Sequence, residues 1–65
     1  DNNPLTEREL AVLVEAEKGL PTKTIAANLY LSAGTTRNYL SAIFSKLGVH
    51  NRLEAIRVAK ANQWL

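Results

Sequence analysis

The sequence predicts a small all-α domain of four helices. Residues that begin or end helices recur along the chain, and apolar residues follow them at the three- and four-residue spacing of a helix. No stretch alternates apolar and polar residues for long enough to form a strand. At 65 residues the chain is one domain, and 46% hydrophobic residues are enough for a core and too many for a disordered segment.

The first helix is marked at both ends. Thr6 is a good N-cap, and Glu9 stands three residues later, which predicts a capping box in which each side chain accepts from the other residue's backbone N–H. Gly19 is expected to stop the helix, because glycine adopts the left-handed turn cheaply. The carboxylate of Glu9 is otherwise expected to be solvated. The apolar stripe expected for this helix consists of Leu10, Leu13 and Val14.

Two further helices are joined by a tight turn. The second helix begins at Pro21 or Thr22, where proline's missing N–H costs nothing. Ser32 caps the third helix, about 33–47, which Gly48 ends. The buried stripe expected for the third helix consists of Thr36, Leu40, Ile43, Phe44 and Leu47.

The fourth helix begins at Asn51. Glu54 stands at the third position after this cap, which predicts a second capping box. Ala55, Ile56 and Ala59 supply an apolar face. Trp64 is expected to pack the C-terminal tail against the first or fourth helix, because a large aromatic ring is seldom left wholly exposed.

Composition argues against several classes of function. The chain has no cysteine and one histidine, so neither a disulfide framework nor a metal site is expected, and no cofactor is implied. His50 has no carboxylate or serine at a diagnostic spacing, and no glycine-rich phosphate loop is present, so no enzyme is predicted. No apolar run is long enough to span a bilayer, and no membrane partner is expected.

Charge is distributed unevenly along the chain. The formal net charge is +2, but residues 1–18 carry −3 and residues 19–65 carry +5. Charge alone is compatible with ordinary solvated surface. Residues 32–48, however, contain no acid, whereas a solvated helix of this length usually carries Glu–Lys pairs. This absence favours a surface for a polyanion.

The short second helix, the turn and the longer third helix have the order of a helix-turn-helix unit. In such a unit the third helix lies in the major groove of DNA, with its outward residues at base edges. The outward face expected here consists of Gly34, Arg37, Asn38, Ser41 and Ser45. Arginine can pair bidentately with guanine and asparagine with adenine, so this face predicts nucleic-acid binding. A plain helical bundle with a polar surface is the alternative.

An ordered set of motifs over the chain resembles the LuxR-type helix-turn-helix domain, which is common at the C-terminus of NarL/FixJ-type response regulators. The motifs are Leu5-Thr6-Glu7-Arg8-Glu9, Gly19-Leu20, Lys23, Ile25-Ala26, Leu29, Leu31-Ser32, Thr35, Lys46-Leu47-Gly48-Val49 and Arg52-Leu53-Glu54-Ala55.

The resemblance implies a four-helix LuxR/NarL-type bundle over residues 5–65, with the helix-turn-helix at about 22–41 and a linker remnant at 1–4. It implies sequence-specific binding to double-stranded DNA as the output domain of a bacterial transcriptional regulator. The regulator is expected to be a cytoplasmic two-component response regulator, associated with the nucleoid when bound, whose N-terminal receiver or sensor domain is absent from this chain. No small-molecule substrate is implied.

The resemblance also assigns site residues. Base contacts are expected at Arg37, Asn38 and Ser41. Phosphate contacts are expected at Thr22, Lys23, Gly34, Thr35, Tyr39, Ser45 and Lys46. A homodimer on DNA is expected through the fourth helix, at Val58 and Ala61.

Three positions depart from the usual pattern of the family. Ala33 replaces an acid, Thr36 replaces valine and Ser41 replaces a basic residue. The hydroxyl of Thr36 is costly in a core unless it bonds to a carbonyl one turn earlier. A protein-interaction or dimerisation module without DNA contact stays open as the alternative function.

Overall fold

The computed structural model describes residues 3–65. Its helices are α1 (Glu7–Glu17), α2 (Thr22–Asn28), α3 (Ala33–Leu47) and α4 (Arg52–Ala61). Residues 3–65 form no strand, which confirms the predicted all-α class with four helices. None of these helices is long and apolar enough to cross a membrane.

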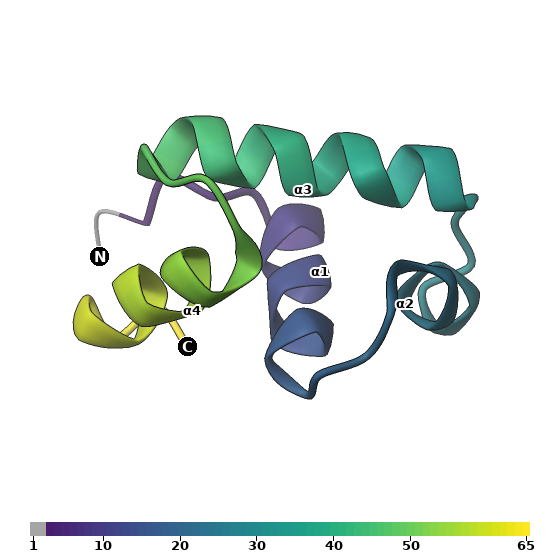
Figure 1. Ribbon diagram of the computed structural model, residues 1–65, viewed down its shortest axis with the longest axis horizontal. Helices are drawn as coiled ribbons and strands as arrows, with labels where there is room; N and C mark the ends of the chain where they lie inside the picture. The colour runs from purple at the N-terminus through teal and green to yellow at the C-terminus, as the bar shows by residue number, and fades with distance from the viewer. Residues whose placement is uncertain (1–2) are drawn as a thin grey trace.

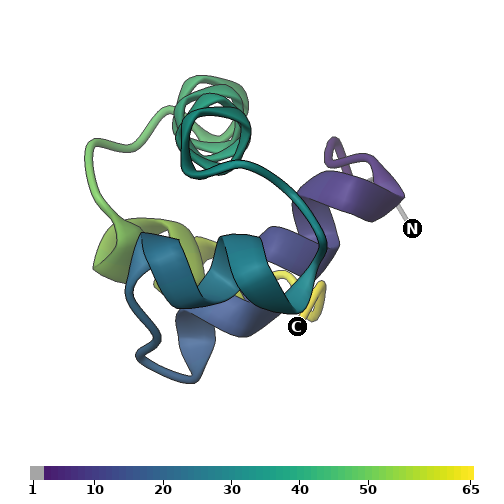
Figure 2. The ribbon, with the colours of Figure 1, turned by 90° about the vertical axis from the view of Figure 1, so that its right-hand side faces the viewer.

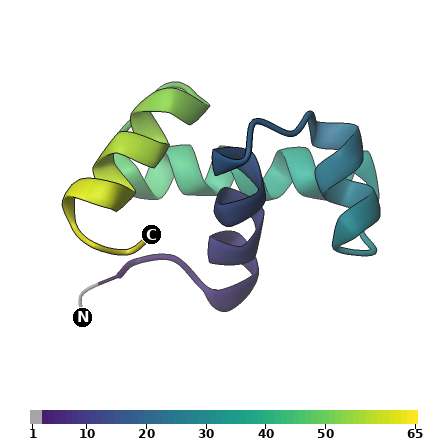
Figure 3. The same ribbon diagram turned by 90° about the horizontal axis from the view of Figure 1, so that it is seen from below.

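The helices form two levels. α1 lies at the centre and contacts each of the other three helices (Figure 1). α2 and α4 lie on opposite sides of α1, as the view from below shows (Figure 3). Seen along α3, the other three helices lie on one side of it (Figure 2). The opposite side of α3 is therefore not covered by another helix.

The predicted caps of α1 and α3 are confirmed. Thr6 Oγ1 accepts from the Glu9 N–H at 3.2 Å, and Glu9 Oε1 accepts from the Thr6 N–H at 2.9 Å. Ser32 Oγ accepts from the Thr35 N–H at 3.0 Å. Gly48 ends α3 in the left-handed region, with φ +67°. A short helix without these partners would leave its terminal N–H groups unpaired.

The second predicted capping box is only half correct. Asn51 Oδ1 accepts from the Glu54 N–H at 2.9 Å, as expected. The carboxylate of Glu54, however, accepts from the N–H of His50 rather than from that of Asn51. The two caps also differ in backbone, because φ is −157° at Asn51 and −73° at Thr6. The carboxylate therefore meets an amide one residue earlier than in α1.

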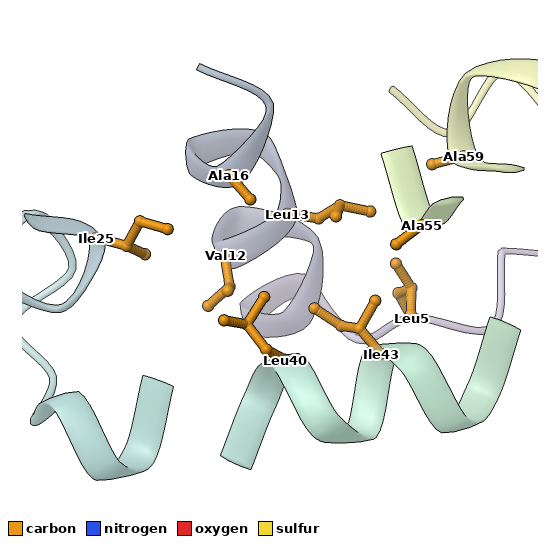
Figure 4. Packing of buried hydrophobic residues seen from close by; sticks show 9 residues of the cluster. All are labelled: Leu5, Val12, Leu13, Ala16, Ile25, Leu40, Ile43, Ala55 and Ala59. Atoms are coloured by element: carbon orange, nitrogen blue, oxygen red, sulfur yellow. The ribbon is translucent and has the colours of Figure 1, made fainter. Parts of the chain in front are cut away.

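The core lies where α1 meets the other helices. Figure 4 shows that Leu40 and Ile43 of α3 point toward α1. The expected stripe on α1 is partly wrong, because Val12, Leu13 and Ala16 are the buried apolar residues of this helix and Val14 is 37% exposed. Spacings of three and four residues allow two overlapping stripes, and the packing partners decide between them.

Two expected contacts with the core are present. Thr36 is fully buried, and its hydroxyl donates to the Ser32 carbonyl at 3.0 Å, one turn earlier. Trp64 is half-buried and packs against the core cluster.

The expected linker remnant at 1–4 lies partly outside the described residues, which begin at Asn3. Asn3 Oδ1 accepts from the N–H of Leu5 at 2.9 Å, and the side chain of Leu5 is buried in the core. Leu5 is therefore part of the folded domain.

Candidate nucleic-acid interface

The uncovered side of α3 carries the predicted outward face. Gly34, Arg37, Asn38, Ser41 and Ser45 are all exposed. The opposite face of the helix is buried through Thr36, Leu40 and Ile43. The helical period therefore separates a core face from a polar face that contains no acid. We call the five exposed residues the α3 face.

The base-reading candidates on the α3 face are free to bind a ligand. Within residues 3–65 the side chains of Arg37, Asn38 and Ser41 form no hydrogen bond or ion pair with protein groups. Their donors and acceptors are satisfied by solvent in the isolated domain, and a partner with matching groups can replace that solvent.

Gly34 at the tip of the α3 face is not required by the backbone. It does not have a positive φ, and a Cβ built there would meet Ser32 Oγ at 3.9 Å, which is ordinary van der Waals contact. The fold would therefore accept a larger residue. A glycine at this exposed position leaves room for close approach of another surface to the start of α3.

The expected phosphate contacts lie in three environments. Lys23 is exposed at the start of α2, next to the half-buried Thr22. Thr35 is exposed in the first turn of α3, where its hydroxyl accepts from Ser32 Oγ at 2.9 Å. Tyr39 is half-buried and packs against the core.

Lys46 near the end of α3 is held by an acid. Its Nζ lies 2.7 Å from Oε1 of Glu9, which belongs to the first turn of α1. Glu9 is only 5% exposed, so the expectation that it is solvated is wrong. Burial raises the pKa of Glu9, but hydrogen bonds from Lys46 and Thr6 outweigh it, so the pKa lies below the usual 4.5.

A shallow open groove of about 250 Å³ lies beside this ion pair. Its lining residues are Glu9, Thr35, Asn38, Tyr39 and Ala42. The groove therefore runs from the first turn of α1 along the flank of α3, next to the α3 face. It belongs to the same surface as the base-reading and phosphate candidates.

Arg52 was not identified from the sequence as a site residue. Its guanidinium donates to the carbonyl of Leu20 and, at 2.7 Å, to Oγ1 of Thr22. The start of α4 is thereby tied to the start of α2. Because the Thr22 hydroxyl accepts from a cation, its own proton stays available to a phosphate oxygen. The partners are 30 and 32 residues apart, so no local pattern could have revealed them.

The outer face of α4 differs from the expected dimer face. Ala61 is exposed, but Val58 is half-buried. Leu53 is the large apolar residue that α4 exposes, at 58%. Leu53 and Ala61 are eight residues apart in sequence, which places them about 80° from each other around the helix and so on the same broad side of it. Helix periodicity alone could have included Leu53.

Metal binding and acid–base catalysis find little support among residues 3–65. Within residues 3–65 no three side chains of His, Asp or Glu lie close enough to hold a metal ion. The open groove contains one ionisable acid, Glu9, and this acid is paired.

The chain is similar to known regulators over nearly its whole length. It is 49% identical over 61 residues to the response regulator RamR of Streptomyces coelicolor, covering 94% of this chain and 30% of RamR. It is 50% identical over 62 residues to the transcriptional regulatory protein DesR of Bacillus subtilis, covering 95% of this chain and 31% of DesR. The chain therefore spans about a third of the length of these relatives.

Structure and family agree with the sequence similarity. The crystal structure of the response regulator ChrA from a heme-sensing two-component system matches with a TM-score of 0.91 and 37% identity. The match covers all of this chain and 32% of the ChrA chain. Residues 3–59 match the GerE family, bacterial regulatory proteins of the luxR family. The resemblance inferred from the sequence is confirmed, and the chain belongs to the luxR family as a helix-turn-helix domain.

Proposed function

We propose that this domain binds specific sequences in double-stranded DNA, with α3 in the major groove. The observation that carries the proposal is the α3 face, which is exposed, polar, free of acids and without protein partners for Arg37, Asn38 and Ser41. These side-chain types match the donor and acceptor patterns of base edges. The space above Gly34 allows the helix to approach the groove closely.

Phosphate contacts would lie on both flanks of α3. Lys23 and the Thr22 hydroxyl stand at the start of α2, and Lys46 stands near the end of α3. The remaining phosphate candidates are Gly34, Thr35, Tyr39 and Ser45. Contacts of this kind fix the register of the protein on the duplex, while base contacts supply sequence preference.

The domain would serve as the output domain of a bacterial response regulator. RamR and ChrA are both described as response regulators, and the chain covers about a third of each. In this arrangement a receiver or sensor domain lies outside the chain, and the regulator acts in the cytoplasm on DNA. Two copies would meet through α4, with Leu53 added to Ala61 and the half-buried Val58.

A direct test uses fluorescence anisotropy with labelled duplexes of random sequence and of a sequence selected for binding. Affinity for the random duplex should fall with salt, with a log–log slope of several units. Arg37→Ala should weaken binding to the selected sequence by about 1–3 kcal/mol and relax one base position. Arg57→Ala, an exposed arginine of α4, is the matched control and should have a smaller effect on the selected sequence.

Equal losses on selected and random duplexes would remove Arg37 from base reading. Absence of binding at low salt, by the domain and by a tethered dimer, would contradict the proposal. That result would favour a protein-interaction module instead. The dimer contact is tested separately, because Leu53→Glu should weaken cooperative binding to two half-sites and leave binding to one half-site unchanged.

A further inference from the structure

Glu9 and Lys46 form an ion pair whose members differ in exposure. The side chain of Lys46 is 37% exposed, whereas that of Glu9 is 7% exposed. The carboxylate is held in place independently of the lysine, because it also accepts from the Thr6 N–H at 2.9 Å as part of the cap of α1. The acid is therefore a fixed charge, and the lysine side chain beside it stays partly exposed to solvent.

The pair lies at the edge of the proposed DNA surface. Glu9 lines the open groove together with Asn38 of the α3 face and with Thr35 and Tyr39, which are candidate phosphate contacts. A phosphate that reaches the Lys46 amine must therefore approach a fixed carboxylate. The Lys46 ammonium group has three donors, so it can donate to a Glu9 carboxylate oxygen and to a phosphate oxygen at once. The negative charges of the carboxylate and the phosphate, however, repel each other.

Lys23, the other lysine among the phosphate candidates, is different. It is exposed, and no acid lies within ion-pair distance of it among residues 3–65. Its full charge is available to a phosphate. Lys46 and Lys23 therefore carry the same ammonium group, but of the two only Lys46 has an acidic partner among residues 3–65.

We propose that Glu9 acts as an internal counter-ion of Lys46 that weakens the attraction of the domain for DNA of any sequence. Glu9 thereby lowers the affinity for specific and random duplexes by the same factor and makes both less dependent on salt, so base contacts supply a larger share of the binding free energy that remains. This inference rests on the proposed function, because it requires that the surface around α3 binds DNA. Glu9 acts through Lys46 and does not touch the nucleic acid.

The test measures the salt dependence of affinity for a random duplex. Glu9→Gln keeps an oxygen for the Thr6 N–H, so the cap can persist, but removes the charge. Each phosphate neutralised contributes about 0.9 unit of log–log slope. Glu9→Gln should therefore steepen the slope by up to about 0.9 and tighten binding on the order of tenfold at 50 mM salt, as 0.9 unit per phosphate implies.

The matched control is Glu7→Gln, which removes an exposed acid from the same turn of α1. Its effect on the slope should be less than half that of Glu9→Gln. In the Glu9→Gln background, adding Lys46→Gln should remove this gain and return the slope to the wild-type value or slightly below it. The ratio of affinities for selected and random duplexes should stay unchanged in Glu9→Gln, because a gain common to all sequences multiplies both affinities by the same factor.

A second comparison leaves Glu9 and its cap untouched. In the wild-type background Lys23→Gln should flatten the slope by about 0.9 unit, as one lost phosphate contact predicts, and Lys46→Gln by less than half as much. Equal flattening by the two variants would overturn the inference. So would weaker binding or an unchanged slope in a folded Glu9→Gln variant, since Glu9 would then orient Lys46 or have no effect on it. DNA binding by the wild type in those experiments would leave the proposed function standing, whereas its absence would remove both.

Discussion

Thr36 allows a test of how a buried hydrogen bond and a buried methyl group compare in their effect on the stability of this core. The residue is fully buried, and its hydroxyl donates to the Ser32 carbonyl at 3.0 Å. The same carbonyl also accepts from the Thr36 N–H at 3.0 Å. Replacing threonine by valine therefore removes a hydroxyl together with its hydrogen bond but leaves no buried carbonyl without a partner.

The magnitude follows from these contacts. The lost hydrogen bond is worth about 1 kcal/mol net. This net value already includes the cost of desolvating the hydroxyl, and against it stands the gain from a buried methyl, about 0.8 kcal/mol. The two contributions nearly cancel, so Thr36→Val should change the free energy of unfolding by less than about 1 kcal/mol and shift the Tm by less than the roughly 4–8 °C that about 1 kcal/mol gives in a domain this small.

The assay is thermal and urea unfolding followed by circular dichroism. Thr36→Ser is the matched control, because it keeps the hydroxyl and deletes the methyl, and it should cost about 1 kcal/mol. Binding to DNA should be unchanged in Thr36→Val, since residue 36 lies on the buried face of α3. A valine variant that is less stable than the wild type by more than about 2 kcal/mol would refute the reasoning, because the hydroxyl bond would then be worth far more than about 1 kcal/mol net.

Two further predictions concern interactions between distant elements. The pKa of Glu9 is lower in the folded chain than its ordinary 4.5, so the stability that its charge supplies is present above that value and is lost as pH falls through the folded pKa. Urea unfolding as a function of pH should show the cost of Glu9→Gln shrinking below about pH 4.5, and a cost independent of pH would contradict the assignment. Arg52→Lys removes the paired donors to Leu20 and Thr22 and should destabilise the domain by about 1–3 kcal/mol. An unchanged urea midpoint would show that this link between α4 and α2 contributes nothing.

Local signals were sufficient to predict the helices. A cap acts within a few residues, so Thr6, Ser32 and Asn51 mark helix starts that the structure confirms. The choice of buried residues on α1 was less secure. Val12 and Val14 are chemically alike and both fit a helical stripe, and only the position of α3 decides that Val12 is buried and Val14 exposed.

The site was predictable to the extent that helix periodicity defines it. Burial of Thr36 and Leu40 turns Arg37 and Asn38 outward, so the α3 face could be read from spacing alone. The ion pair of Lys46 could not, because Glu9 is 37 residues away in sequence and reaches it only after α1 has packed on α3.

The central claim is that the α3 face binds DNA, and an amide chemical-shift titration of the labelled domain with a short duplex tests it most directly. The account predicts the largest shifts at Gly34, Arg37, Asn38 and Ser41 and at the start of α2, with small shifts on the outer face of α4 when single half-sites are used. Shifts concentrated around Leu53, or none at low salt, would contradict it.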